Sequence, residues 1–155
     1  MVERRGGRPP ERREPDVEVR MDDFKIARGE SLGTEGLGTC AGIAFDHRPS
    51  QTGAMGHFPD YGRGEVAGLA RTFFEESGAD PTEVKAYLRG ASPAGPEENL
   101  VEFAHLTRIE AEEGVRESGI LPENTDVLWQ SDSTQSDTMF LDTATGEFTS
   151  RVEED

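Results

Sequence analysis

A cysteine and a histidine, separated by a stretch rich in small residues, are the side chains of this sequence best suited to chemistry. Cys40 is the single cysteine of the 155-residue chain, and His57 follows it 17 positions later, in a second short apolar segment. A thiol becomes a strong nucleophile when a neighbouring base removes its proton. If the chain folds back between the two residues, the spacing predicts a nucleophile–base pair. A lone cysteine that is only a small buried hydrophobic residue is the structural alternative.

The segment that precedes the cysteine is rich in glycine, with three glycines between positions 33 and 39. Backbone N–H groups in such a segment can converge on a sulfur atom or on an oxyanion beside it. We therefore expect Gly36, Gly38 and Thr39 to support the oxyanion of an acyl-transfer reaction. These glycines do not predict a nucleotide-binding loop, because no strand–loop–helix with a Lys-Ser/Thr pair follows them.

The remaining polar and aromatic candidates have simpler interpretations. His47 falls in an expected turn at 46–52 and should be an exposed loop residue, and His105 should be exposed or half-buried on a helix. Three histidines and one cysteine have no zinc-like spacing, so neither a metal nor another cofactor is expected. Trp129 is expected to be a core or cleft-rim aromatic. Three clusters of acidic residues are expected to be solvated surface rather than acid–base pairs: 97–98, 110–113 and 153–155.

The hydrophobic pattern predicts strands at both ends of the chain and two helices between them, which indicates an α+β domain. The domain is expected to span residues 16–152, between a disordered Arg- and Pro-rich tail at 1–15 and an acidic tail at 153–155. The expected helices are 64–77 and 95–118. Residues 29–39 are expected to be a strand end that continues into a tight loop. The expected strands lie around 17–19, 24–26, 41–45, 53–58, 84–88, 126–130, 138–141 and 147–152.

The composition excludes several classes of function. Thirty-two acidic residues against 16 basic ones leave a formal net charge of −16, which argues against nucleic acid and anionic membranes as partners. No apolar run approaches the ~18 residues of a membrane span, and no secretory signal is recognisable. The single cysteine fits a reducing compartment, so a cytoplasmic location is expected. An acidic, lysine-poor surface also favours adaptation to concentrated salt, which screens self-repulsion.

Two short motifs give the sequence a resemblance to a known family. Residues 34–40 read T-E-G-L-G-T-C, an apolar segment then closes on Asp46, and residues 53–57 read G-A-M-G-H. This pattern resembles the signature of the CheD family, the chemoreceptor glutamine deamidases of bacterial and archaeal chemotaxis. That family carries T-x-G-L-G-S-C followed by G-x-M-x-H, and Thr39 stands here in place of the usual serine. The resemblance covers about residues 16–152.

The resemblance implies a fold, a reaction and roles for individual residues. The fold would be an α/β sandwich of mixed β-sheets with two main helices outside, of the cysteine-hydrolase kind shared with some deamidating bacterial toxins. Cys40 would be the nucleophile, His57 the base, and Thr34 the group that orients the histidine. The reaction would convert glutamines on the cytoplasmic helices of chemoreceptors to glutamate with release of ammonia. The resemblance also allows glutamate methyl esters as substrates and a CheC-type phosphatase as a partner.

Three segments depart from the family's pattern: residues 58–62, 89–99 and 131–137. All three are expected to flank the cleft, so the sequence supports the chemistry better than it supports the identity of the substrate. The alternative is therefore a catalytically inactive or re-targeted CheD-like module that binds chemotaxis proteins. Retention of Thr34, Cys40 and His57 together favours the enzyme, because a pure binding module does not need all three.

Overall fold

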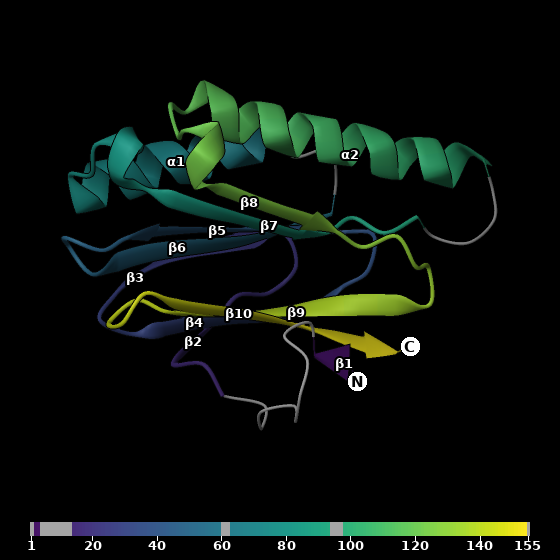
Figure 1. Ribbon diagram of the computed structural model, residues 1–155, viewed down its shortest axis with the longest axis horizontal. Helices are drawn as coiled ribbons and strands as arrows, with labels where there is room; N and C mark the ends of the chain where they lie inside the picture. Colours follow the sequence, from purple (N-terminus) through teal and green to yellow (C-terminus); the bar gives the residue numbers. More distant parts are fainter. Residues whose placement is uncertain (1, 4–13, 60–62, 94–97, 155) are drawn as a thin grey trace.

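The computed structural model describes residues 2–3, 14–59, 63–93 and 98–154. Within these ranges the chain forms two five-stranded β-sheets and two α-helices, arranged as three layers (Figure 1). Both helices cover one face of a central sheet, and a distal sheet covers the other face. The expected α+β class, with mixed sheets and two main helices outside, is confirmed. Most of the expected tail at 1–15 lies outside the described residues, as does Asp155.

The distal sheet is mixed, because β2 runs parallel to β4 while the other neighbours are antiparallel. Its strands follow one another across the sheet in the order β1-β10-β9-β4-β2. Their bounds are β1 (Val2–Glu3), β10 (Glu147–Glu154), β9 (Gln135–Asp142), β4 (Ser31–Leu37) and β2 (Val17–Glu18). The hairpin of β9 and β10 turns at Gly146, whose φ of +79° suits the glycine expected there.

The central sheet is also mixed, with β7 and β8 as its parallel pair. Its strands lie in the order β3-β6-β5-β7-β8. Their bounds are β3 (Asp23–Arg28), β6 (Thr52–Phe58), β5 (Ala41–His47), β7 (Lys85–Gly90) and β8 (Thr125–Trp129). Every residue of β5 and β6 is buried. A strand covered on both faces needs no polar alternation, which explains the short, continuous apolar runs that predicted these two strands.

The two helices are α1 (Arg63–Ser77) and α2 (Glu98–Glu117), close to the expected ranges. Their apolar faces pack on the central sheet, where Phe73 of α1 contacts Phe45 of β5 with ring centroids 5.7 Å apart. Burying an aromatic side chain of this kind stabilises the fold by roughly 2–3 kcal/mol. The helices therefore fix the back of the sheet that carries both Cys40 and His57. Two short 3₁₀-helices complete the described elements, Pro81–Glu83 and Pro122–Asn124.

Two sequence-based expectations were wrong. The glycine-rich segment at 29–39 is largely the strand β4 rather than a loop, because its glycines permit close packing and a bulge within a sheet. A Cβ on Gly33 would lie 2.8 Å from Cγ of Pro15, and Gly36 adopts a φ of +73° where the pairing with β9 is irregular. His47 is buried rather than exposed, because β5 extends through it and its Nδ1 lies 2.7 Å from Oγ of Ser50.

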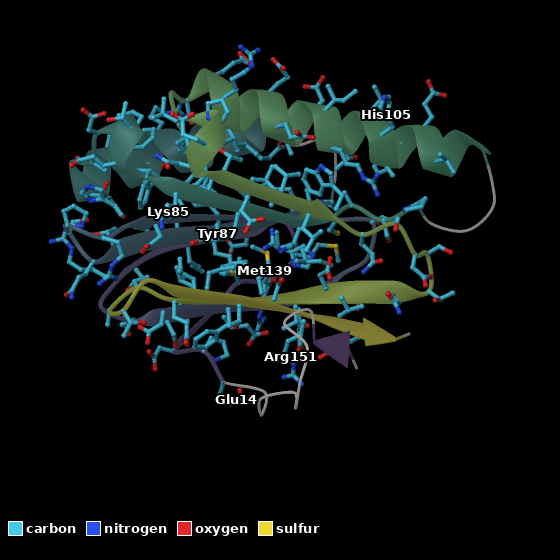
Figure 2. The ribbon with its side chains drawn as sticks, in the orientation of Figure 1. Glu14, Lys85, Tyr87, His105, Met139 and Arg151 are labelled. Carbon is cyan, nitrogen blue, oxygen red and sulfur yellow. The ribbon has the colours of Figure 1, made fainter. Side chains whose placement is uncertain are left out.

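An apolar layer between the two sheets positions the candidate site. Met139 of β9 and Tyr87 of β7 project into this layer from opposite sheets (Figure 2). The sheets approach closely at Gly42 of β5, where a Cβ would lie only 2.5 Å from Sδ of Met139. Cys40 belongs to the same buried cluster. Cys40 thus lies at the interface of the two sheets and not under the helices.

Candidate functional site

His57 is held by a hydrogen bond that joins the two sheets. Its Nδ1 atom lies 2.8 Å from Oγ1 of Thr34, a residue of β4 in the distal sheet. The Thr34 hydroxyl donates its own proton to the backbone carbonyl of Val19, at 2.6 Å. Because a hydroxyl carries one proton, it must accept the bond from His57, so Nδ1 carries a proton. The lone pair of the neutral imidazole is consequently on Nε2, the atom that a general base needs.

The surroundings of His57 favour the neutral base. Its side chain is buried, and burial lowers the pKa of the imidazole below its ordinary value of 6.5. Among the described residues, Nε2 is a buried nitrogen without a hydrogen-bond partner. An unsatisfied buried acceptor is uncommon in folded proteins and needs an explanation. A nitrogen that receives a proton only during a reaction would provide one.

Strand pairing places Cys40 on the same side of the central sheet as His57. Gly42 of β5 is the register partner of His57 in β6. Side chains alternate along a strand, so Cys40, two residues before Gly42, faces the intersheet layer and lies diagonal to His57. Such diagonal neighbours have Cβ atoms about 7 Å apart, within reach of an imidazole and a thiol that lean toward each other. Gly42 itself contributes no side chain between them.

The backbone before Cys40 crosses from one sheet to the other. β4 ends at Leu37 in the distal sheet and β5 begins at Ala41 in the central sheet, so only residues 38–40 make the crossing. The N–H of Gly38 donates to the carbonyl of Gly36 at 2.9 Å, and the carbonyl of Gly38 accepts from Ser92 at 2.8 Å. Gly36, Gly38 and Thr39, the expected oxyanion support, therefore lie at the end of β4 and in the crossing that leads to Cys40. The Gly38 amide, however, bonds within the segment in this state.

The end of β7 forms a second backbone support, which was not predicted from the sequence. Gly90 and Ala91, at the end of β7, both have positive φ values, +86° and +51°. The N–H of Ala91 donates to the carbonyl of Cys40 at 2.8 Å. A Cβ on Gly90 would lie 2.4 Å from that same carbonyl oxygen, so only glycine fits. The only local signal for this contact is the pair Gly90-Ala91 at the end of an expected strand.

The other candidates lie away from this cluster or have structural contacts. His47 and Asp46 lie at the opposite end of β5, where burial raises the pKa of the Asp46 carboxyl. His105 is exposed on the outer side of α2 (Figure 2). Trp129 packs against the helix-side core, and its indole N–H donates to Glu112 at 3.1 Å. The described residues contain no group of three His, Cys, Asp or Glu side chains arranged to hold a metal.

No protein-family model matches this sequence, and no curated protein matches it. The structure is similar to that of the hypothetical protein YfiH from Bacillus licheniformis, with a TM-score of 0.53 at 10% identity over 72% of this chain and 51% of that one. YlmD from Geobacillus stearothermophilus is also similar, with a TM-score of 0.50 at 10% identity over 88% of this chain and 68% of that one. Our chain spans about half the length of the YfiH protein. At this identity the likeness shows the fold alone.

Neither of the two described α-helices, α1 and α2, has both the length and the apolar character that a membrane-crossing helix needs.

Proposed function

We propose that this protein is a cysteine-dependent amidohydrolase that converts glutamine side chains of a partner protein to glutamate. The observation that carries the proposal is the Thr34–His57 hydrogen bond, which leaves a buried, unpartnered Nε2 on the face of the sheet that also carries Cys40. The motif resemblance to the CheD family supplies the substrate class, glutamines on the cytoplasmic helices of chemoreceptors. We extend the proposal to a cytoplasmic location and, as a second partner, to a CheC-type phosphatase.

The first half of the reaction makes a thioester. His57 Nε2 takes the thiol proton of Cys40 while the sulfur bonds to the carboxamide carbon, and the carbonyl oxygen becomes an oxyanion. Amide N–H groups of the crossing segment stabilise this oxyanion, with Thr39 as the proposed donor because Gly38 donates to Gly36. The C–N bond then breaks as His57 returns the proton to the departing nitrogen, which leaves as ammonia.

The second half restores the enzyme. Neutral His57 removes a proton from water as the water oxygen bonds to the thioester carbon. The C–S bond then breaks, and the Cys40 sulfur recovers the proton from His57. The product is a glutamate side chain, which adds one negative charge to the partner at neutral pH. Thr34 holds the imidazole through both halves, because its hydroxyl can accept from Nδ1–H whether the ring is neutral or charged.

A binding module is the second candidate, and the burial of the site favours it. Cys40 is 7% exposed and His57 4% exposed, so a substrate amide has little access to the sulfur in this conformation. In that case the CheD-like fold would bind a receptor or phosphatase, and Cys40 and His57 would have no catalytic role. The two candidates differ in one property. The enzyme needs a reactive thiol, whereas the module does not.

The experiment measures chemistry and binding on the same variants. Wild-type protein, Cys40→Ala and His57→Ala would be incubated in concentrated KCl with receptor helix peptides that contain glutamine. Conversion to glutamate would be followed by mass spectrometry and ammonia by a coupled assay. Equal amounts of glutamate and ammonia from the wild type, with none from either variant, would support the enzyme. Peptide binding that is equal in all three proteins, with no conversion, would overturn it in favour of the module.

A further inference from the structure

The short segment that supports Cys40 is itself held by an arginine from α2. Arg108 donates through Nε to the carbonyl of Ala91 at 3.0 Å and through Nη2 to the carbonyl of Gln130 at 2.6 Å. These two carbonyls follow the ends of β7 and β8, the parallel pair of the central sheet. Gln130 also donates its N–H to the carbonyl of Gly90 at 2.8 Å. One guanidinium therefore joins two strand ends to the helix that covers them.

Ala91 links Arg108 to the nucleophile within a single residue. Its carbonyl accepts from Arg108 on one side, and its N–H donates to the carbonyl of Cys40 on the other. Alanine at a φ of +51° is in the left-handed region, which a residue with a Cβ adopts only when its surroundings enforce it. The planar guanidinium of Arg108 is suited to enforcing it, because its bond to the Gln130 carbonyl fixes the direction from which Nε reaches the Ala91 carbonyl.

The neighbouring residue extends the same support. Ser92 donates its N–H to the carbonyl of Gly38, so consecutive amides at 91 and 92 bind both ends of the turn that presents the sulfur. Gly90 donates to Oδ2 of the buried Asp137 at 3.0 Å, which ties the segment to the distal sheet. If Ala91 relaxed to a negative φ, its N–H would turn away from Cys40. The sulfur would then lose its placement relative to His57.

We propose that Arg108 is a positioning residue for the Cys40 nucleophile, acting through the left-handed Ala91. The inference rests on the proposed function, since it concerns the reactivity of the same thiol. Arg108 donates its two hydrogen bonds to backbone carbonyls, whereas the imidazole of His57 is held by Thr34. The effect of Arg108 is on where the sulfur lies, and thus on how readily His57 removes the thiol proton. A helix-to-sheet tie without this role would change stability and leave thiol reactivity unchanged.

The test compares iodoacetamide alkylation of Cys40 across pH in wild type, Arg108→Ala, Arg108→Lys and His57→Ala. Arg116→Ala is the matched control, because Arg116 is an exposed arginine of the same helix that pairs with Glu113. We expect Arg108→Ala to slow alkylation at neutral pH by about 10- to 100-fold, the range that follows from a misplaced reacting group. The pH at which alkylation is half-maximal should move toward ~8.5, the pKa of a free thiol. The alkylation rate and midpoint of Arg108→Lys should lie between those of the wild type and Arg108→Ala, and those of Arg116→Ala should match the wild type.

The outcomes separate this inference from the proposed function. A wild-type midpoint near that of free cysteine, unchanged by His57→Ala, would refute the nucleophile–base pair and the role of Arg108 with it. A low wild-type midpoint that His57→Ala removes, but that both Arg108 variants retain, would overturn the positioning role alone. The positioning role would be rejected in that case even if the variants melt at a lower temperature. If Arg108→Ala does not fold, a wild-type profile in Arg108→Lys is sufficient to reject the role.

Discussion

Replacement of Thr34 by valine tests the orientation of His57 with almost no change in side-chain shape. The substitution removes the hydroxyl that donates to the Val19 carbonyl and accepts from Nδ1–H of His57. Both partners remain buried between the sheets, and an unsatisfied buried polar group costs about 1–3 kcal/mol. With two such groups left without a partner, we expect Thr34→Val to lower the free energy of unfolding by about 2–6 kcal/mol.

The same variant should also impair the thiol. Without the hydroxyl, the imidazole divides between its two tautomers, and the form protonated on Nε2 cannot accept the proton of Cys40. Removing a carboxylate that orients a catalytic histidine costs about 10⁴-fold. Because a neutral hydroxyl orients more weakly, we expect alkylation to slow by roughly 10- to 100-fold. Thr34→Ser is the matched control, since it keeps the hydroxyl and loses one methyl group, worth about 1 kcal/mol.

Alkylation rates can be measured without background, because Cys40 is the single cysteine. Urea unfolding gives the stability of each variant, and the ¹⁵N shifts of the His57 ring report its tautomer. All measurements should share one KCl concentration. A folded Thr34→Val protein that alkylates at the wild-type rate, with Nδ1 still protonated, would refute the role given to Thr34.

Three further predictions concern pH, packing and salt. Because burial lowers the pKa of His57, the imidazole stays neutral to below pH 6.5, and alkylation should rise as pH increases through that lowered pKa. The free energy of unfolding should also rise with pH. The contribution of neutral His57 is present above pH 6.5 and is lost as pH falls through the lowered pKa of the folded state. Urea titrations between pH 7 and 5 should therefore show a smaller loss of stability in His57→Gln than in the wild type. Gly90→Ala should lower the free energy of unfolding by about 3 kcal/mol in the same assay, because a Cβ would lie 2.4 Å from the Cys40 carbonyl oxygen at a φ of +86°. Gly64→Ala is the control and should not destabilise, because the space around Gly64 is open. Equal urea midpoints for the two variants would contradict this packing. The net charge of −16 predicts that melting temperature rises from dilute to molar KCl, and a flat or falling curve would exclude salt adaptation.

The parts of the fold that could be predicted from the sequence are those governed by local pattern. α1 follows from apolar residues at helical spacing before Gly78, which adopts a φ of +67° at the helix end. β5 and β6 follow from apolar runs too short for helices. β4 could not be identified in this way. Gly33 is needed for close packing and Gly36 for a bulge, and the sequence pattern does not distinguish these two uses of glycine from a loop. The same holds for His47, whose burial depends on how far β5 extends.

Some residues of the candidate site could be predicted from the sequence and others could not. Cys40, His57 and Thr34 could be proposed together because residue types and a family motif mark them. Arg108 could not, since it is one charged residue in an acid-rich helix and its carbonyl partners are 17 and 22 residues distant. Backbone carbonyls belong to every residue, so a contact with them leaves no trace in the choice of amino acid. The two hydrogen bonds of Arg108 and the positive φ of Ala91 are properties of the fold that a sequence does not display.

The pairing of β4 with β9 has a consequence for the newly made protein. Thr34 takes its place in the distal sheet opposite Met139, and Ser31 pairs with Asp142, more than 100 residues later. During synthesis, Cys40 and His57 emerge long before the strand that completes the seat of Thr34. If Cys40 and His57 form the proposed nucleophile–base pair, the thiol remains an ordinary cysteine on the ribosome and gains its reactivity only when the last strands dock. Such a delay would protect nascent chains from premature alkylation or oxidation, and would make thiol reactivity a measure of completed folding.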